Sequence, residues 1–126
     1  MSLFAGLKKI REFERAQLPF LKSLLDFDIV VEIGYAEEQE QPLTLKRLFL
    51  LNIGSRTTVR RRLTKLIEQG VITRRRHAAD GRAAVLTVSA TSLKTFGKYC
   101  GALSSICELS FKPSSDSTDE RLAHST

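Results

Sequence analysis

The spacing of the apolar residues changes at Gly70, and this change limits the possible folds more than any other feature of the sequence. Before Gly70, apolar side chains recur every three or four residues, as they do on an amphipathic helix. After it, residues 71–76 and 82–88 are strand-like and flank an Asp-Gly pair, the usual signal of a hairpin turn. A chain of 126 residues, about one domain long, must therefore place a helix directly before a β-hairpin.

Two helices are predicted ahead of the hairpin. Thr44 can cap a short helix that carries Leu45, Leu48, Phe49 and Leu51, and the Asn-Ile-Gly sequence of residues 52–54 tolerates a sharp turn. Ser55 can cap a second helix that ends at Gly70. Its inward stripe consists of Val59, Leu63, Leu66 and Ile67. Two helices around such a turn, followed by a hairpin, predict a mainly α fold with a small β-hairpin wing (α+β), the winged helix-turn-helix.

The sequence upstream predicts two further helices. Residues 3–17 alternate apolar and charged side chains at helical spacing. Residues 20–35 are too densely apolar for a surface helix, which favours a central helix with Pro19 in its first turn and an end near Gly34. The acidic stretch 36–41 is predicted to be a solvated connector.

A last helix is predicted to start at a cap formed by Thr91 or Ser92, to run through Leu109, and to stop at Pro113. We therefore divide the chain into four parts. Residues 1–17 and 91–111 are predicted dimerisation helices, residues 18–90 the winged helix-turn-helix domain, and residues 112–126 a disordered tail of polar composition.

Positive charge is concentrated in one block of the sequence. Residues 42–82 contain eleven lysines and arginines but only two acidic residues, whereas the rest of the chain contains nine basic and twelve acidic residues. The pI of 9.7 favours an anionic partner, and the block coincides with the two elements of a winged helix that touch nucleic acid. We therefore predict double-stranded DNA as the partner.

The predicted contacts divide between the two elements. Helix 55–69 would lie in the major groove, where the planar fork of Arg61 can donate two hydrogen bonds to guanine. The wing, residues 71–88, would lie at the minor groove, with Arg82 as the inserted side chain and the neighbouring arginines on phosphates. The predicted DNA-binding residues are Ser55, Arg56, Thr57, Thr58, Arg60, Arg61, Arg62, Lys65, Arg74, Arg75, Arg76, His77, Asp80 and Arg82.

The run from Phe20 to Phe96 resembles the winged-helix core of MarR-type bacterial regulators. The resemblance rests on the Ser-Arg-Thr-Thr-Val sequence of residues 55–59, the Leu-x-x-x-Gly end at Gly70, and the wing sequence Asp80-x-Arg82. It implies a homodimeric transcriptional regulator, a repressor, which binds a palindromic operator through paired helices and wings. It also implies that Arg82 matches the wing arginine of the family. The chain departs from the family in having only about twenty helix-forming residues after the wing.

Other functions find little support in the residues. Cys100 and Cys107 are expected to be free thiols buried in the core, and neither His77 nor His124 has the partners that zinc requires. No phosphate-binding glycine loop or nucleophile elbow is present, so we predict neither an enzyme nor a cofactor. No apolar run is long enough to span a bilayer and no secretory signal begins the chain, which predicts a cytoplasmic, nucleoid-associated protein without a membrane partner.

Two alternatives stay open at this point. Winged helices also serve as protein-interaction or scaffold modules, although these would carry apolar or acidic residues where helix 55–69 carries arginine. A DNA-binding protein of plasmid or phage replication or partition would have the same residues as a regulator. A small-molecule effector is not indicated by any motif, and the sequence leaves that question open.

Overall fold

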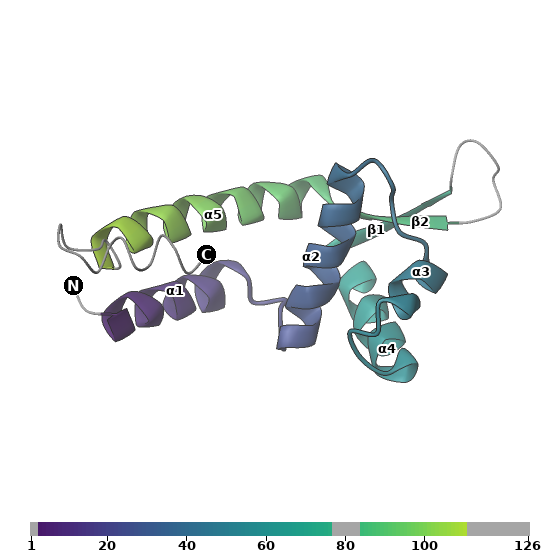
Figure 1. Cartoon of the computed structure of the whole chain (residues 1–126), viewed down its shortest axis with the longest axis horizontal. Helices are drawn as coiled ribbons and strands as arrows, with labels where there is room; N and C mark the ends of the chain where they lie inside the picture. The colour runs from purple at the N-terminus through teal and green to yellow at the C-terminus, as the bar shows by residue number, and fades with distance from the viewer. Residues whose placement is uncertain (1–2, 77–83, 111–126) are drawn as a thin grey trace, which may run out of the picture. The chain divides into compact units, whose positions relative to one another are not determined.

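The computed structural model describes residues 3–76 and 84–110, which form five helices and one hairpin within those ranges (Figure 1). The elements are α1 (Leu3–Gln17), α2 (Leu24–Glu38), α3 (Leu45–Leu50), α4 (Arg56–Glu68), β1 (Ile72–Arg76), β2 (Ala84–Val88) and α5 (Ala90–Ser110). They belong to two compact units, one from Pro19 to Thr95 and one that combines α1 with α5 from Phe96 onward. This mainly helical fold with one antiparallel hairpin confirms the predicted fold class.

Local signals place the boundaries of α3 and α4 where the sequence predicts them. The Thr44 hydroxyl accepts the backbone N–H of Arg47 at 3.2 Å, and the Ser55 hydroxyl accepts that of Thr58 at 3.3 Å. Both caps supply an acceptor to an N–H group that has no partner inside its helix. After α4, Gly70 adopts a φ of 75°, a left-handed conformation that ends helices and that favours glycine.

The core of the Pro19–Thr95 unit lies between α2, α4 and the hairpin. Val59, Leu63 and Leu66 are buried, so the predicted inward stripe of α4 is confirmed for these three residues. Residue 43 joins the hairpin, because its carbonyl accepts the backbone N–H of Leu86 at 2.8 Å and Thr44 pairs with Val85. The buried apolar side chains of this unit are Ile29, Val30, Ile33, Leu43, Leu48, Val59, Leu63, Leu66, Val71, Ile72, Leu86 and Val88.

Helix α2 differs from the prediction at both ends. It starts at Leu24 rather than in the turn after Pro19, because the Ser23 hydroxyl caps it by accepting the N–H of Asp26. It continues through Gly34 to Glu38, so part of the predicted connector is helical. A tertiary contact favours this extension, since the Glu37 carboxylate accepts the N–H of Val88 at 3.2 Å.

The density of apolar residues also overstated the burial of α2. Ile29, Val30 and Ile33 are buried, whereas Leu24, Val31 and Tyr35 are exposed. Spacing explains the difference, because residues 24, 31 and 35 share the opposite side of the helix from residues 29, 30 and 33. Helix α2 therefore packs into the core with one side and exposes the other to solvent.

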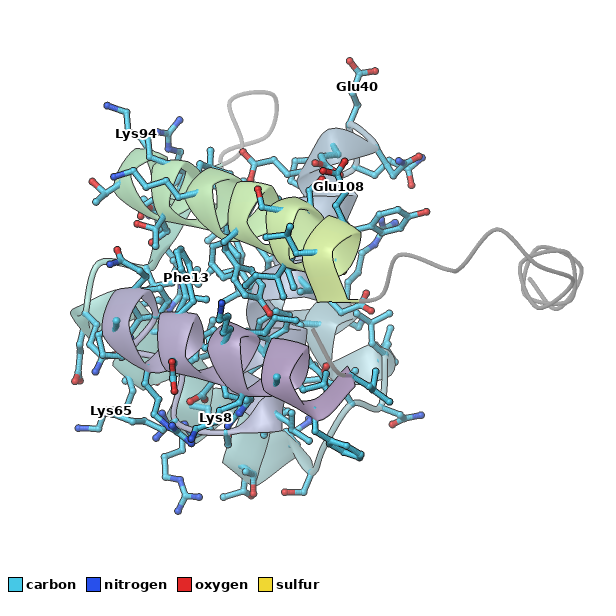
Figure 2. The ribbon with its side chains drawn as sticks, turned by 90° about the vertical axis from the view of Figure 1, so that its left-hand side faces the viewer. Lys8, Phe13, Glu40, Lys65, Lys94 and Glu108 are labelled. Carbon is cyan, nitrogen blue, oxygen red and sulfur yellow. The ribbon has the colours of Figure 1, made fainter. Side chains whose placement is uncertain are left out.

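The second unit pairs α1 with the C-terminal part of α5 in antiparallel orientation (Figure 1). The rings of Phe13 and Tyr99 stack with centroids 6.0 Å apart, and the Tyr99 hydroxyl donates to Glu14 Oε2 at 2.5 Å. Phe13 points from α1 toward α5 in Figure 2, while Lys8 lies on the other side of α1. These contacts hold the two helices together within one chain.

Two predictions about α5 are wrong. Its start is capped by the Ser89 hydroxyl, which accepts the backbone N–H of Ser92, rather than by Thr91 or Ser92. Cys100 and Cys107 are free but exposed, not buried. The buried Tyr99 shows the reason, because α5 meets α1 on the side of Tyr99 and its cysteines lie on another side of the helix. The predicted stop at Pro113 lies outside the described residues.

Candidate nucleic-acid interface

Helix α4 presents one apolar and one basic face. Its buried side packs into the core, and its solvent side carries the exposed residues Arg56, Thr57, Arg60, Arg61, Thr64 and Lys65. Within the described residues, the side chain of Arg61 has neither a hydrogen bond nor an ion pair. The exposed face therefore offers cationic and hydroxyl groups to a partner, with Arg61 ready to donate from its whole guanidinium.

The first turn of α4 is ordered by its own side chains. Ser55 Oγ donates to Thr58 Oγ1 at 2.8 Å while it accepts the N–H of Thr58. The two predicted contact residues Ser55 and Thr58 thus have a structural partner in each other, and Thr58 is only partly exposed. Thr57 lies beside them and is exposed.

Two arginines of α4 lie over an aromatic ring of α3. The guanidinium carbons of Arg56 and Arg60 are 4.9 Å and 5.4 Å from the centroid of the Phe49 ring. A guanidinium at that distance is attracted to the negative face of the ring. Phe49 therefore restrains both arginines near the start of α4, and sequence spacing on α4 alone gives no signal of this contact.

Arg62 points away from the other arginines, toward α2. Its Nε donates to Asp26 Oδ1 at 2.6 Å and its Nη2 donates to Oδ2 at 2.8 Å. The Asp26 carboxylate is fully buried and also accepts the backbone N–H of Lys22 at 2.6 Å. The hydrogen bond to Asp26 raises the pKa of the Arg62 guanidinium, an effect that burial opposes. The structure thus gives Arg62 an internal partner, and a DNA contact by this residue stays a prediction.

Lys65 has only a weak partner. Its Nζ lies 3.7 Å from Glu68 Oε2, and more than half of each side chain is exposed. Exposed pairs at this distance contribute little to stability, and salt screens them. Figure 2 shows Lys65 projecting into solvent, so its charge stays accessible to an anionic partner.

The hairpin adds a second group of arginines. Arg74, Arg75 and Arg76 occupy the exposed end of β1, opposite Leu86, Val85 and Ala84 of β2. Because side chains alternate along a strand, Arg74 and Arg76 share one face and Arg75 lies on the other. The remaining predicted contacts of the wing, His77, Asp80 and Arg82, lie outside the described residues.

Neither a metal centre nor a membrane span appears in the part of the chain that the structure describes. Residues 3–76 and 84–110 contain no group of three or more histidine, cysteine, aspartate or glutamate side chains that could hold a metal ion. None of the helices in the same ranges is both long and apolar enough to cross a membrane.

No protein-family model and no curated protein matches the sequence. Many solved structures are similar to it, among them the following three. A mutant of MepR from S. aureus has a TM-score of 0.67 at 16% identity, with 96% of this chain and 88% of that chain covered. The transcriptional regulator Tm0710 from Thermotoga maritima has a TM-score of 0.63 at 21% identity, covering 90% and 78%. MarR has a TM-score of 0.59 at 20% identity, covering 97% and 85%.

These similarities concern the fold. Other solved structures that match are described as MarR-family transcriptional regulators, so the resemblance predicted from residues 20–96 is confirmed at the level of the winged-helix fold. Function does not follow from an identity of 21% or less, because one fold supports different functions. The side chains of α4 and the hairpin are therefore what point to a function.

Proposed function

We propose that the protein binds double-stranded DNA and acts as a transcriptional regulator. The observation that carries the proposal is the solvent side of α4, where Arg56, Arg60, Arg61 and Lys65 are exposed on the second helix of a helix-turn-helix. In this motif the second helix lies in the major groove. An interaction module would need apolar or acidic side chains at these positions, so the basic face favours DNA.

The side chains suggest a division of tasks. Arg61 has no internal partner among the described residues and can use its full planar fork on a guanine, and Thr57 can reach a base or a phosphate. Arg74 and Arg75 on the hairpin would bind phosphates, which adds affinity without sequence preference. Arg82, with Asp80 beside it, would enter the minor groove.

We further propose that the regulator is a homodimer that binds a palindromic operator and represses by occupying a promoter. The unit formed by α1 and the C-terminal part of α5, called the helical unit below, supports this proposal. It exposes large apolar side chains at Leu3, Phe4, Leu7 and Leu109. Phe4 is 76% exposed, which is unusual for a residue of that size unless a partner covers it. A twofold dimer presents two recognition helices and therefore matches a palindrome.

Binding to genomic DNA tests the proposal directly. The full-length chain is mixed with fragmented genomic duplex, bound fragments are retained and sequenced, and fluorescence anisotropy then measures their affinity across a salt series. Enrichment of a few fragments that share an inverted repeat, with affinity that falls steeply with salt, is the expected result. The absence of binding even at low salt would assign the basic face to another partner.

Sedimentation measures the assembly independently. The expected result is a dimer in solution, and Phe4→Ser should shift it toward monomer because the change removes exposed apolar surface from α1. Lys8→Ser, a change on the same helix that removes no apolar side chain, is the matched control. If the wild type is a monomer and binds DNA as a monomer, the dimer proposal is wrong, whereas the proposal of DNA binding stands.

A further inference from the structure

Phe49 belongs to α3 but contacts two cationic side chains of α4. The guanidinium groups of Arg56 and Arg60 lie 4.9 Å and 5.4 Å from the centre of its ring, and both arginines are exposed. Residues 56 and 60 are one helical turn apart, so their charges repel each other across a short distance. The negative face of the ring offsets part of this repulsion and favours the arrangement with both guanidinium groups beside one aromatic side chain.

The contact with the ring leaves hydrogen-bond donors available. Attraction between a guanidinium and the face of an aromatic ring uses the charge of the group and none of its N–H donors, so these can still bind a phosphate with two parallel hydrogen bonds. Phe49 lies on the first helix of the helix-turn-helix, the helix that crosses the DNA backbone in this motif. The two arginines are therefore placed for phosphates rather than for base edges.

We propose that Phe49 is a positioning residue of the DNA interface, which holds Arg56 and Arg60 together so that both bind phosphates of the DNA backbone. This inference rests on the proposed function. Its physical basis is preorganisation: an arginine that is already restrained in the free protein loses less side-chain entropy when it binds. Phe49 itself need not touch the DNA.

Salt-dependent DNA binding by Phe49→Leu tests the proposal. The variant keeps an apolar side chain in the space between α3 and α4 but removes the ring. We expect affinity for specific and random duplexes to fall about tenfold in both cases, with sequence preference unchanged and a shallower salt dependence, because phosphate contacts are weakened. Phe49→Tyr, which keeps the aromatic ring, should bind both duplexes with the affinity of the wild type. Where Phe49→Leu does not fold, as judged by circular dichroism, Phe49→Met takes its place in every measurement.

A mutant cycle separates positioning from general packing. In a background of Arg56→Ala and Arg60→Ala, Phe49→Leu should have no further effect on affinity, because the residues through which it acts are gone. In a background of Arg75→Ala, a hairpin arginine without a contact to Phe49, it should have its full effect. Equal losses in both backgrounds, or an unchanged salt dependence, would show that Phe49 only packs and would overturn the proposal.

The arrangement in the free protein can be measured without DNA. By nuclear magnetic resonance, ring current should shift the Cδ protons of Arg56 and Arg60 upfield in the wild type and in Phe49→Tyr, but not in Phe49→Leu. Unshifted protons in the wild type would overturn the inference. If the wild type does not bind DNA, the proposed function is wrong, and the phosphate role of the two arginines is wrong with it. The proton shifts would still decide whether the ring holds the arginines.

Discussion

The guanidinium of Arg62 in α4 and the carboxylate of Asp26 in α2 form two hydrogen bonds of 2.6 Å and 2.8 Å, and the carboxylate is fully buried. A charge that leaves water in this way needs a counter-charge and further hydrogen bonds. Arg62 supplies the counter-charge, and the backbone N–H of Lys22 supplies a further hydrogen bond. The pair therefore fixes α4 to the start of α2.

Arg62→Ala should destabilise the fold. The change leaves the Asp26 carboxylate buried without its counter-charge, and we expect the free energy of unfolding in urea to fall by about 3 kcal/mol. Lys65→Ala, which removes the exposed partner of Glu68, should change it by less than about 0.5 kcal/mol. If Arg62→Ala matched this control in stability and instead lowered DNA affinity, Arg62 would serve the DNA, as its sequence position suggested.

Ser55→Ala should weaken the start of α4. The hydroxyl caps the N–H of Thr58, and loss of an N-cap costs about 1 kcal/mol of stability. Ser55→Asp keeps an acceptor at the same place and should retain most of the stability, as thermal unfolding would show. Similar losses for the two variants would mean that the cap contributes little.

The stability of the helical unit should fall in alkali because of Tyr99. Two effects raise the pKa of the Tyr99 phenol above its ordinary value of about 10. The larger is burial, and the second is the hydrogen bond to Glu14. Above that pH the unfolded phenol loses its proton while the folded one keeps it, so the unfolded state binds fewer protons. The stabilisation is therefore fully present below about pH 10 and is lost as the pH rises further.

Tyr99→Phe provides the measurement for this pH dependence. It removes the titrating group, so urea unfolding above about pH 10 should show the wild type losing stability relative to the variant. Below that pH, the difference between the two proteins should be constant. Parallel curves across the alkaline range would contradict a raised pKa of Tyr99.

Arg61→Ala and Arg75→Ala should affect DNA binding differently. Arg61→Ala is expected to reduce the preference for the selected operator by about 1–3 kcal/mol, because it removes a base contact. Arg75→Ala is expected to weaken all sequences alike and to reduce the slope of log affinity against log salt by about one. Anisotropy with operator and random duplexes at several salt concentrations measures both. Identical effects of the two changes on both duplexes would contradict the division of tasks.

Features that depend on a few neighbouring residues were predictable from the sequence. Thr44 and Ser55 are the caps of α3 and α4, and Gly70 ends α4, because each signal lies within one turn of the backbone it satisfies. The start of α2 had a signal of the same kind. Ser23, three residues before Asp26, has the spacing of a capping box and competes with Pro19 as a signal for the start of the helix.

Features that depend on another element were not predictable. Helix α2 continues past Gly34 because Glu37 reaches Val88, fifty-one residues away. The cysteines of α5 are exposed because the side of α5 that carries Tyr99 meets α1, and helical spacing alone does not say which of two apolar sides will find a partner. Periodicity defines the sides of a helix but not what lies against them.

Periodicity, caps and composition are local properties of the sequence, so they predict the order of the elements, the winged-helix arrangement and the concentration of positive charge in residues 42–82. The partner of each arginine of α4, by contrast, depends on how the helices pack against one another. Arg62 pairs with a carboxylate thirty-six residues away, Arg56 and Arg60 lie over a ring of α3, and Arg61 faces solvent. Identical side chains take different roles because folding brings different partners to each side of the helix.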